Sequence, residues 1–230
     1  IQGFFTGASV RPGLRGSKTL KSIVKYNFRR SFSDHFNHLR TFAFNDEAGL
    51  LMGTYPRGNR PQSPFPYCNE VMTGFEYTAA IGLLYEGELR DGLRCIEAVR
   101  ARYDGKKRNP FDEAECGHHY ARAMASWAAV LALTGFSYSA VTGKIQFGNP
   151  EGSNVKWFFS TGEAWGTVRI THLKKGDILA ELKVIHGKLR LTEFSMKEYD
   201  TRIWKTAITL HENEDLKVEL KRKSVIRGNV

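Results

Sequence analysis

The stretch Asn109–Trp127 reads Asn-Pro-Phe-Asp-Glu-Ala-Glu-Cys-Gly-His-His-Tyr-Ala-Arg-Ala-Met-Ala-Ser-Trp, a charged turn that leads into an alanine-rich run. The run stays apolar as far as Thr134 and is followed by Gly135, so we predict a helix over residues 116–134. Burying three acidic residues and two histidines beside such a helix is costly unless they pair with each other or bind a polar ligand. The stretch therefore predicts a binding site near the start of a helix.

Further helices are expected on the N-terminal side of this stretch. Apolar residues recur at helical spacing over residues 17–32, 70–86 and 89–103, and Gly87 separates the last two. Residues 33–69 are rich in glycine and proline and are expected to be mostly irregular, with a short strand pair within 41–52. This half of the chain therefore reads as helical hairpins with short connections.

After Tyr138 the pattern changes to alternating apolar and polar residues, which is typical of strands. Turn residues at 175–177 and 186–187 predict hairpins between them. The expected strands are 144–148, 155–160, 165–172, 178–186, 188–196, 206–211 and 216–221. Helices followed by strands predict an α+β protein with two parts, residues 1–137 and residues 138–230, the second a strand-rich antiparallel β segment.

Composition excludes several classes of protein. The net charge of +10 is spread along the chain and interleaved with acids, so we expect a solvated surface and no nucleic-acid partner. No apolar run approaches the roughly 20 residues of a transmembrane helix, so no transmembrane segment is expected. The cysteines at 68, 95 and 116 lack the spacing of metal ligands, so we expect reduced or buried thiols, no metal and no cofactor. Unpaired cysteines slightly favour the cytoplasm as the location of the protein. Phosphate-cradling, serine-hydrolase and zincin motifs are absent from the sequence.

Glu113 and Arg122 flank the start of the expected helix 116–134. A guanidinium with a carboxylate can clamp neighbouring hydroxyls of a ligand, and it can equally form an ion pair that holds a loop to a helix. Glu70, at an expected helix start, is either a cap or part of the same site. His118 and His119 are adjacent and point to different faces, which disfavours a metal; His119 is a candidate to hydrogen-bond a substrate, with a structural role as the alternative.

Two other groups of residues can be explained by a structural role as well as by a functional one. Asp46 and Glu47 are adjacent carboxylates, but adjacency does not place two carboxyls at the separation a glycosidase needs, so a solvated turn is favoured. The loop Pro64–Tyr67 carries two aromatic residues, and it forms either an aromatic rim of a binding site or a packed loop.

Four segments together, Asn27-Phe28, Thr41–Leu51, Pro64–Tyr77 and Arg102–Trp127, resemble the C-terminal half of the catalytic domain of glycoside hydrolase family 116. This is the family of non-lysosomal glucosylceramidase (bile-acid β-glucosidase) and its bacterial β-glucosidase relatives. The resemblance covers about residues 16–137, and the stretch from Asn109 is its most specific part. The chain departs from the family at Met72, where tryptophan is usual.

The resemblance implies that the helices are the C-terminal hairpins of an (α/α)6 barrel and that the parent protein is a retaining β-glycosidase. It implies that Glu113 and Arg122, with Glu70 nearby, hold the sugar in the −1 subsite. No catalytic residue is assigned to this chain, because the nucleophile and the acid/base of the family lie upstream of these motifs. The expected partners are a β-glucoside, glycolipid or oligosaccharide substrate and the remainder of the catalytic domain. The alternative is a non-catalytic carbohydrate-binding or accessory module.

Overall fold

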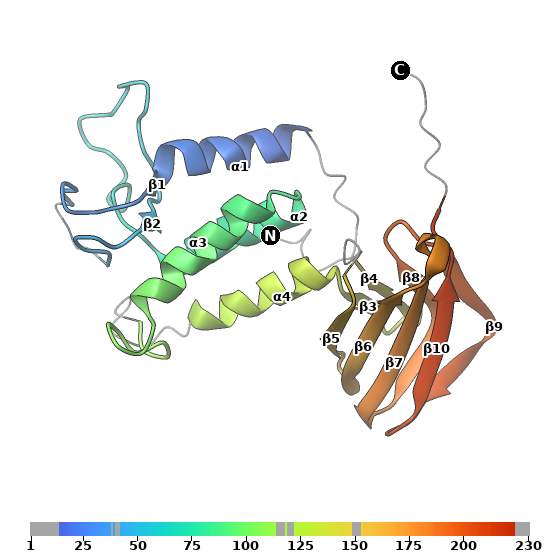
Figure 1. The fold of residues 1–230 in the computed structure, drawn as a ribbon. Coiled ribbons are helices and arrows are strands. Elements are labelled where there is room, and N and C mark those ends of the chain that lie inside the picture. The colour runs from blue at the N-terminus through green and yellow to red at the C-terminus, as the bar shows by residue number, and fades with distance from the viewer. Residues whose placement is uncertain are drawn as a thin grey trace, which may run out of the picture. The chain divides into compact units, whose positions relative to one another are not determined.

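The computed structural model describes residues 14–37, 39, 42–113, 118, 122–148 and 153–223 (Figure 1). In this described part the protein is α+β, with four α-helices and ten strands in three sheets. The chain divides at Thr134 into two compact units, which we call the helical unit (within residues 9–133) and the β unit (within 134–230). None of the described helices combines the length and the apolar character needed to cross a bilayer.

The helical unit begins with α1, Leu14–Asn27, which ends five residues earlier than predicted. Its continuation, Phe28–Arg29, is strand β1 and pairs antiparallel with β2, Gly49–Leu50. Asn27 explains the change of direction, because its amide donates to the Leu51 carbonyl oxygen (3.2 Å) and accepts from the Thr54 hydroxyl (2.8 Å). The strand expected within 41–52 therefore exists, but its partner lies outside that segment.

The remaining helices are α2 (Thr73–Tyr85), α3 (Leu89–Arg102) and α4 (Trp127–Thr134), with the 3₁₀ helix η3 (Arg122–Ser126) just before α4. The predicted helix 70–86 starts at Thr73 instead, because Val71 is extended and bridges to Leu51. In the predicted helix 116–134, the described part is a 3₁₀ turn followed by two α-helical turns. These helices share a core of Tyr77, Ile81, Leu84, Val99, Tyr103 and Ala129.

The β unit contains two four-stranded sheets. The first has the order β10-β7-β6-β5 and is antiparallel throughout. Its strands are β5 (Val155–Ser160), β6 (Ala164–His172), β7 (Ile178–Gly187) and β10 (Asp215–Leu220). The second has the order β3-β4-β8-β9, with strands β3 (Ser137–Ser139), β4 (Lys144–Phe147), β8 (Leu189–Met196) and β9 (Thr201–Leu210).

Two expectations for the β unit were wrong. The segment is not purely antiparallel, because β4 and β8 pair in parallel, with Ile145 opposite Phe194. The expected hairpin at 186–187 is a crossover between sheets, since β7 pairs with β6 and β10 whereas β8 pairs with β4 and β9. The hairpin predicted at 175–177 is present and joins β6 to β7 through the 3₁₀ turn η4, Lys174–Gly176.

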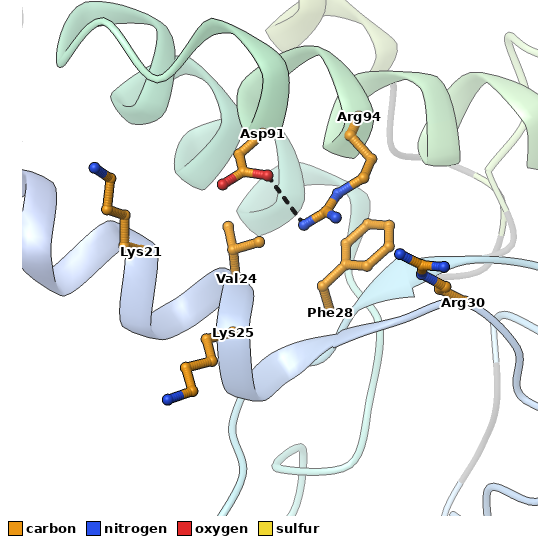
Figure 2. Close-up of a pocket in the computed structure, with 7 residues that line it drawn as sticks. All are labelled: Lys21, Val24, Lys25, Phe28, Arg30, Asp91 and Arg94. Atoms are coloured by element: carbon orange, nitrogen blue, oxygen red, sulfur yellow. Dashed lines mark ion pairs between the residues drawn. The ribbon is translucent and has the colours of Figure 1, made fainter.

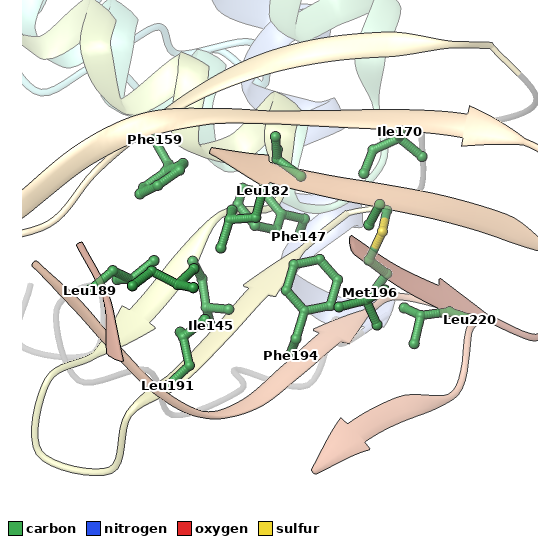
Figure 3. Packing of buried hydrophobic residues seen from close by; sticks show 14 of the residues in the cluster. Ile145, Phe147, Phe159, Ile170, Leu182, Leu189, Leu191, Phe194, Met196 and Leu220 are labelled. Carbon is green, nitrogen blue, oxygen red and sulfur yellow. The ribbon is translucent and has the colours of Figure 1, made fainter. Parts of the chain in front are cut away.

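The inward faces of both sheets contribute to one hydrophobic core (Figure 3). From Ala164 to Ile170 on β6 and from Ile178 to Val184 on β7, every second residue is buried, as the alternating sequence predicted. Each fully buried Leu, Ile or Phe contributes about 1.5–3 kcal/mol relative to an exposed one, so this core holds the two sheets together. Its labelled members in Figure 3 are Ile145, Phe147, Phe159, Ile170, Leu182, Leu189, Leu191, Phe194, Met196 and Leu220.

Candidate functional site

Four glutamates in the described part of the helical unit are buried: Glu47, Glu70, Glu76 and Glu113, with exposed fractions of 8%, 1%, 1% and 3%. Carboxylates are almost never fully buried unless they are paired or hydrogen-bonded. The partners of each one therefore show whether it serves the fold or belongs to a candidate site.

Glu113 is held at the first turn of α2. The hydroxyl of Thr73, the first residue of that helix, donates to Glu113 Oε2, and both side chains are buried. Burial is the main cause that raises the pKa of Tyr77 on α2 and of Tyr103 after α3, and the negative charge of Glu113 adds to both increases. Glu113 is therefore an oriented carboxylate close to two tyrosines, 40 residues along the chain from the helix that holds it.

Glu70 lies three residues before Thr73, in the extended segment that precedes α2. Its Oε1 accepts hydrogen bonds from the backbone amides of Val71 (2.9 Å) and Phe42 (3.3 Å), and its Oε2 accepts one from Asn37 Nδ2 (3.3 Å). The expectation of a carboxylate at a helix start was wrong, because the helix begins at Thr73. Glu70 instead holds Asn37 and the Phe42 backbone beside the segment that leads into α2.

The other two predicted site residues are not described at the level of side chains. Arg122 is the first residue of η3, but only its backbone is described, and His119 lies outside the described residues. The neighbouring His118 is exposed, with Nδ1 2.8 Å from the Asp112 carboxylate. The clamp of Glu113 with Arg122 and the substrate contact of His119 therefore stay predictions.

Sequence reasoning missed the ion pair between Glu76 on α2 and Arg102 on α3, in which both side chains are 1% exposed. Arg102 also donates to the Ala48 carbonyl oxygen, and the Leu50 amide donates to Glu76 Oε1 (2.8 Å). Burial raises the pKa of Glu76 above its ordinary value, and the charge of Arg102 opposes part of that increase. The pair ties β2 to both helices, and its one signal in the sequence is a carboxylate beside Tyr77 in an apolar helix.

A solvated turn was expected for Asp46 and Glu47. Asp46 is exposed, but Glu47 is buried, so the expectation was wrong for Glu47. Its carboxylate makes a two-pronged ion pair with Arg108, at 2.6 and 3.0 Å, and accepts the Phe44 amide at 2.8 Å. The Arg108 guanidinium also lies over the ring of Phe44, 5.2 Å from its centre. Because these bonds hold the turn against the loop after α3, Glu47 has a structural role.

The loop before α2 presents aromatic rings to solvent. Phe65 and Tyr67 are 52% and 37% exposed and meet edge to face, with ring centres 5.6 Å apart. Cys68 and Met72, further along the same segment, are buried. These exposures show that the two rings are not packed beneath the surface, and an aromatic rim of a binding site stays a prediction.

Among the described residues of the helical unit, two shallow hollows stand out, and neither is lined by Glu70 or Glu113. Figure 2 shows the first, of about 300 Å³, where Asp91 pairs with Arg94 (3.1 Å) and the Arg94 guanidinium lies 4.4 Å from the centre of the Phe28 ring. It is lined by Lys21, Val24, Lys25, Phe28, Arg30, Asp91 and Arg94. The second, of about 500 Å³, is lined by residues 87–91 and Arg94. Among the residues that the structure describes, no group of His, Cys, Asp and Glu could hold a metal ion.

No protein-family model matches this chain. No curated protein matches it significantly either. A functional assignment therefore depends on the residues of the site and on the resemblance of the sequence motifs.

Proposed function

We propose that this chain is part of a retaining β-glycosidase similar to glycoside hydrolase family 116, and that it supplies sugar-binding residues of the −1 subsite. The observation that carries the proposal is the buried carboxylate of Glu113, oriented by Thr73 at the N-terminus of α2. It stands at the start of the stretch that resembles the family most specifically.

The contacts between segments support the proposal. The segments that carry the resemblance are far apart in sequence, yet hydrogen bonds that are buried or partly buried connect them: Asn27 to Leu51, Phe42 to Glu70, Thr73 to Glu113, and Arg102 to Ala48. Residues that cooperate in one site need such convergence, because a site must be held to within about 0.5 Å by its supporting contacts.

The chemistry of the subsite follows from an oriented acceptor. A carboxylate whose direction is set by Thr73 can accept a ring hydroxyl from a restricted range of directions, which helps to position the sugar for reaction. Contacts to hydroxyls that strengthen as the ring distorts toward the oxocarbenium-like transition state accelerate hydrolysis. Arg122 is proposed to donate to neighbouring hydroxyls, with Glu70 holding the adjacent loop and His119 as a further donor.

We also propose that the helical unit forms the C-terminal hairpins of an (α/α)6 barrel. The antiparallel pair α2–α3, packed with α4 around one core, is the repeating element that such a barrel requires. The carboxylate nucleophile and the acid/base are expected in sequence upstream of Ile1, and these residues would break the glycosidic bond.

The test uses the protein with its upstream sequence and measures kcat/KM on an aryl β-glucoside. Glu113→Gln, which can keep the bond from Thr73, and Arg122→Ala are each expected to lower kcat/KM by about 10–100-fold, the value of a hydrogen bond to a charged group. Asp112→Asn, one residue away and exposed, is the matched control and should leave kcat/KM unchanged. Folded variants with unaltered kcat/KM would refute the assignment, and glucoside binding without hydrolysis would indicate the carbohydrate-binding module instead.

A further inference from the structure

A row of aromatic rings lies exposed on the outer face of the first sheet of the β unit. Phe158 on β5 and Trp165 on β6 are 50% and 40% exposed, and the side chain of His186 on β7 is 65% exposed. The Trp165 ring centre lies 6.3 Å from that of Phe158 and 6.1 Å from that of His186, with interplanar angles of 40° and 36°. We call these three residues the ring platform.

The strand register places the three rings on one face. Trp165 lies opposite His186 on β7 and Ser160 on β5, and the register shifts by one residue between Trp165 and Gly166. A Cβ atom at Gly166 would lie 1.9 Å from the Lys183 carbonyl oxygen, so only glycine allows the close approach of β6 and β7 at this point. The alternation thus buries Ala164 and Val168 and directs Trp165 outward.

The ring platform is unusual within its own unit. Among the exposed large hydrophobic side chains in the described part of the β unit, the aromatic ones are Phe158 and Trp165, and these two are neighbours. Isolated exposed apolar residues are normal on a protein surface, whereas contiguous ones indicate a binding surface. Rings that contact each other on a rigid sheet also lose little conformational entropy when a ligand covers them.

Polar groups border the rings. His186 Nδ1 lies 3.2 Å from the Glu212 carboxylate, and both side chains are more than half exposed, so hydrogen-bond groups stand at the edge of the ring platform. Further along the same face, Lys217 pairs with Glu181 at 2.9 Å, and Arg169 lies opposite Glu181 in the register. Positive and negative charges therefore alternate on this face, unlike the continuous cationic track that a nucleic-acid backbone requires.

From this combination we infer that the ring platform is a binding site for a neutral polysaccharide, separate from the proposed −1 subsite. The apolar C–H faces of pyranose rings stack on Trp165 and Phe158, and the sugar hydroxyls hydrogen-bond to Glu212 and His186. The inference does not depend on the hydrolase proposal, because it concerns another surface and requires no bond cleavage.

The probe is a panel of neutral polysaccharides (hydroxyethyl cellulose, mixed-linkage β-glucan, laminarin and xylan) cast into native gels, through which the whole chain migrates. At least one polymer is expected to retard the protein, and Trp165→Ala should weaken this binding by about tenfold or more, as for the loss of one stacked ring. Ile203→Ala, which removes a still more exposed apolar side chain from β9 of the other sheet, should have no effect.

Glu212→Gln separates sugar recognition from simple apolar contact. It keeps the rings and should still weaken retardation severalfold if Glu212 accepts sugar hydroxyls. The gels measure binding alone and require no hydrolysis, so this site and the −1 subsite can fail independently. The inference is overturned if no polymer retards the protein, if the folded Trp165→Ala variant is retarded normally, or if the Trp165-dependent ligand is instead a single-stranded nucleic acid or a second copy of the chain.

Discussion

Replacing Arg102 by methionine tests whether the buried ion pair with Glu76 organises the helical unit. Methionine has a similar length and no charge, so the change removes the guanidinium while filling much of its space. It removes the partner of the Glu76 carboxylate and the bond to the Ala48 carbonyl oxygen. The Leu50 amide still donates to Glu76.

The magnitude follows from the burial of both partners, each 1% exposed. Removing one member of a buried pair leaves an uncompensated charge and costs about 3–5 kcal/mol. A domain has a total stability of only about 5–15 kcal/mol, so Arg102→Met should bring the helical unit close to unfolding near neutral pH. Arg90→Met on the exposed side of α3 is the matched control and should change the stability by less than about 0.5 kcal/mol.

The loss should depend on pH in a defined direction. Burial already raises the pKa of Glu76, and without the charge of Arg102 the pKa rises further. A carboxyl group whose folded pKa exceeds its unfolded pKa stabilises the fold at pH values below the unfolded pKa, and this contribution is lost as the pH rises through the folded pKa. Arg102→Met should therefore be less destabilising at about pH 5 than at about pH 8, because protonated Glu76 is cheaper to bury.

The assay is urea unfolding followed by the helical circular-dichroism signal, which reports mainly on the helical unit. Combining Arg102→Met with Glu76→Gln should remove the pH dependence and recover part of the stability. A loss below about 1 kcal/mol, or the same loss at both pH values, would show that the pair is not the organising contact proposed from its burial.

Two further predictions concern the β unit and the buried thiols. Gly166→Ala places a Cβ atom 1.9 Å from the Lys183 carbonyl oxygen and should destabilise the β unit by about 1–3 kcal/mol in thermal unfolding, whereas Gly162→Ala, which meets nothing within 4 Å, should be neutral. Equal melting temperatures for the two variants would contradict this. Burial raises the pKa of the Cys95 thiol to about 12. Iodoacetamide should therefore not label Cys95 at about pH 8 until the protein is unfolded, and peptide mass spectrometry can measure this labelling. Rapid labelling of the folded protein would contradict the burial.

Element types were predictable where the signal is local. The alternation over 178–186 and 188–196 predicted β7 and β8, because side chains on a strand point alternately to opposite faces. The start of β9 was missed by five residues, since Thr201–Lys205 lies at a sheet edge and shows no buried alternation. The end of α1 was missed because Asn27 bonds to Leu51, which no helical periodicity reveals.

The candidate site, too, was predictable from the sequence only in part. The number of charged residues in the stretch from Asn109 predicted that its acidic side chains need partners. Glu113 is buried and accepts a hydrogen bond from a partner side chain. The identity of that partner, Thr73, depends on a fold that brings together residues 40 positions apart. The role of Glu47 also depends on the fold. Its sequence neighbours suggest a solvated turn, but the tertiary structure places Arg108 beside its carboxylate.

The sequence by itself determined that this protein is α+β, with helices preceding strands, because periodicities of 3.6 and 2 are properties of neighbouring residues. Only the tertiary structure decided that β4 and β8 run parallel, that the chain crosses between sheets at Gly187, and that Glu76 pairs with Arg102. Pairing partners and ring contacts such as Trp165 with His186 are set by how distant segments pack together, and that packing leaves no local period in the sequence.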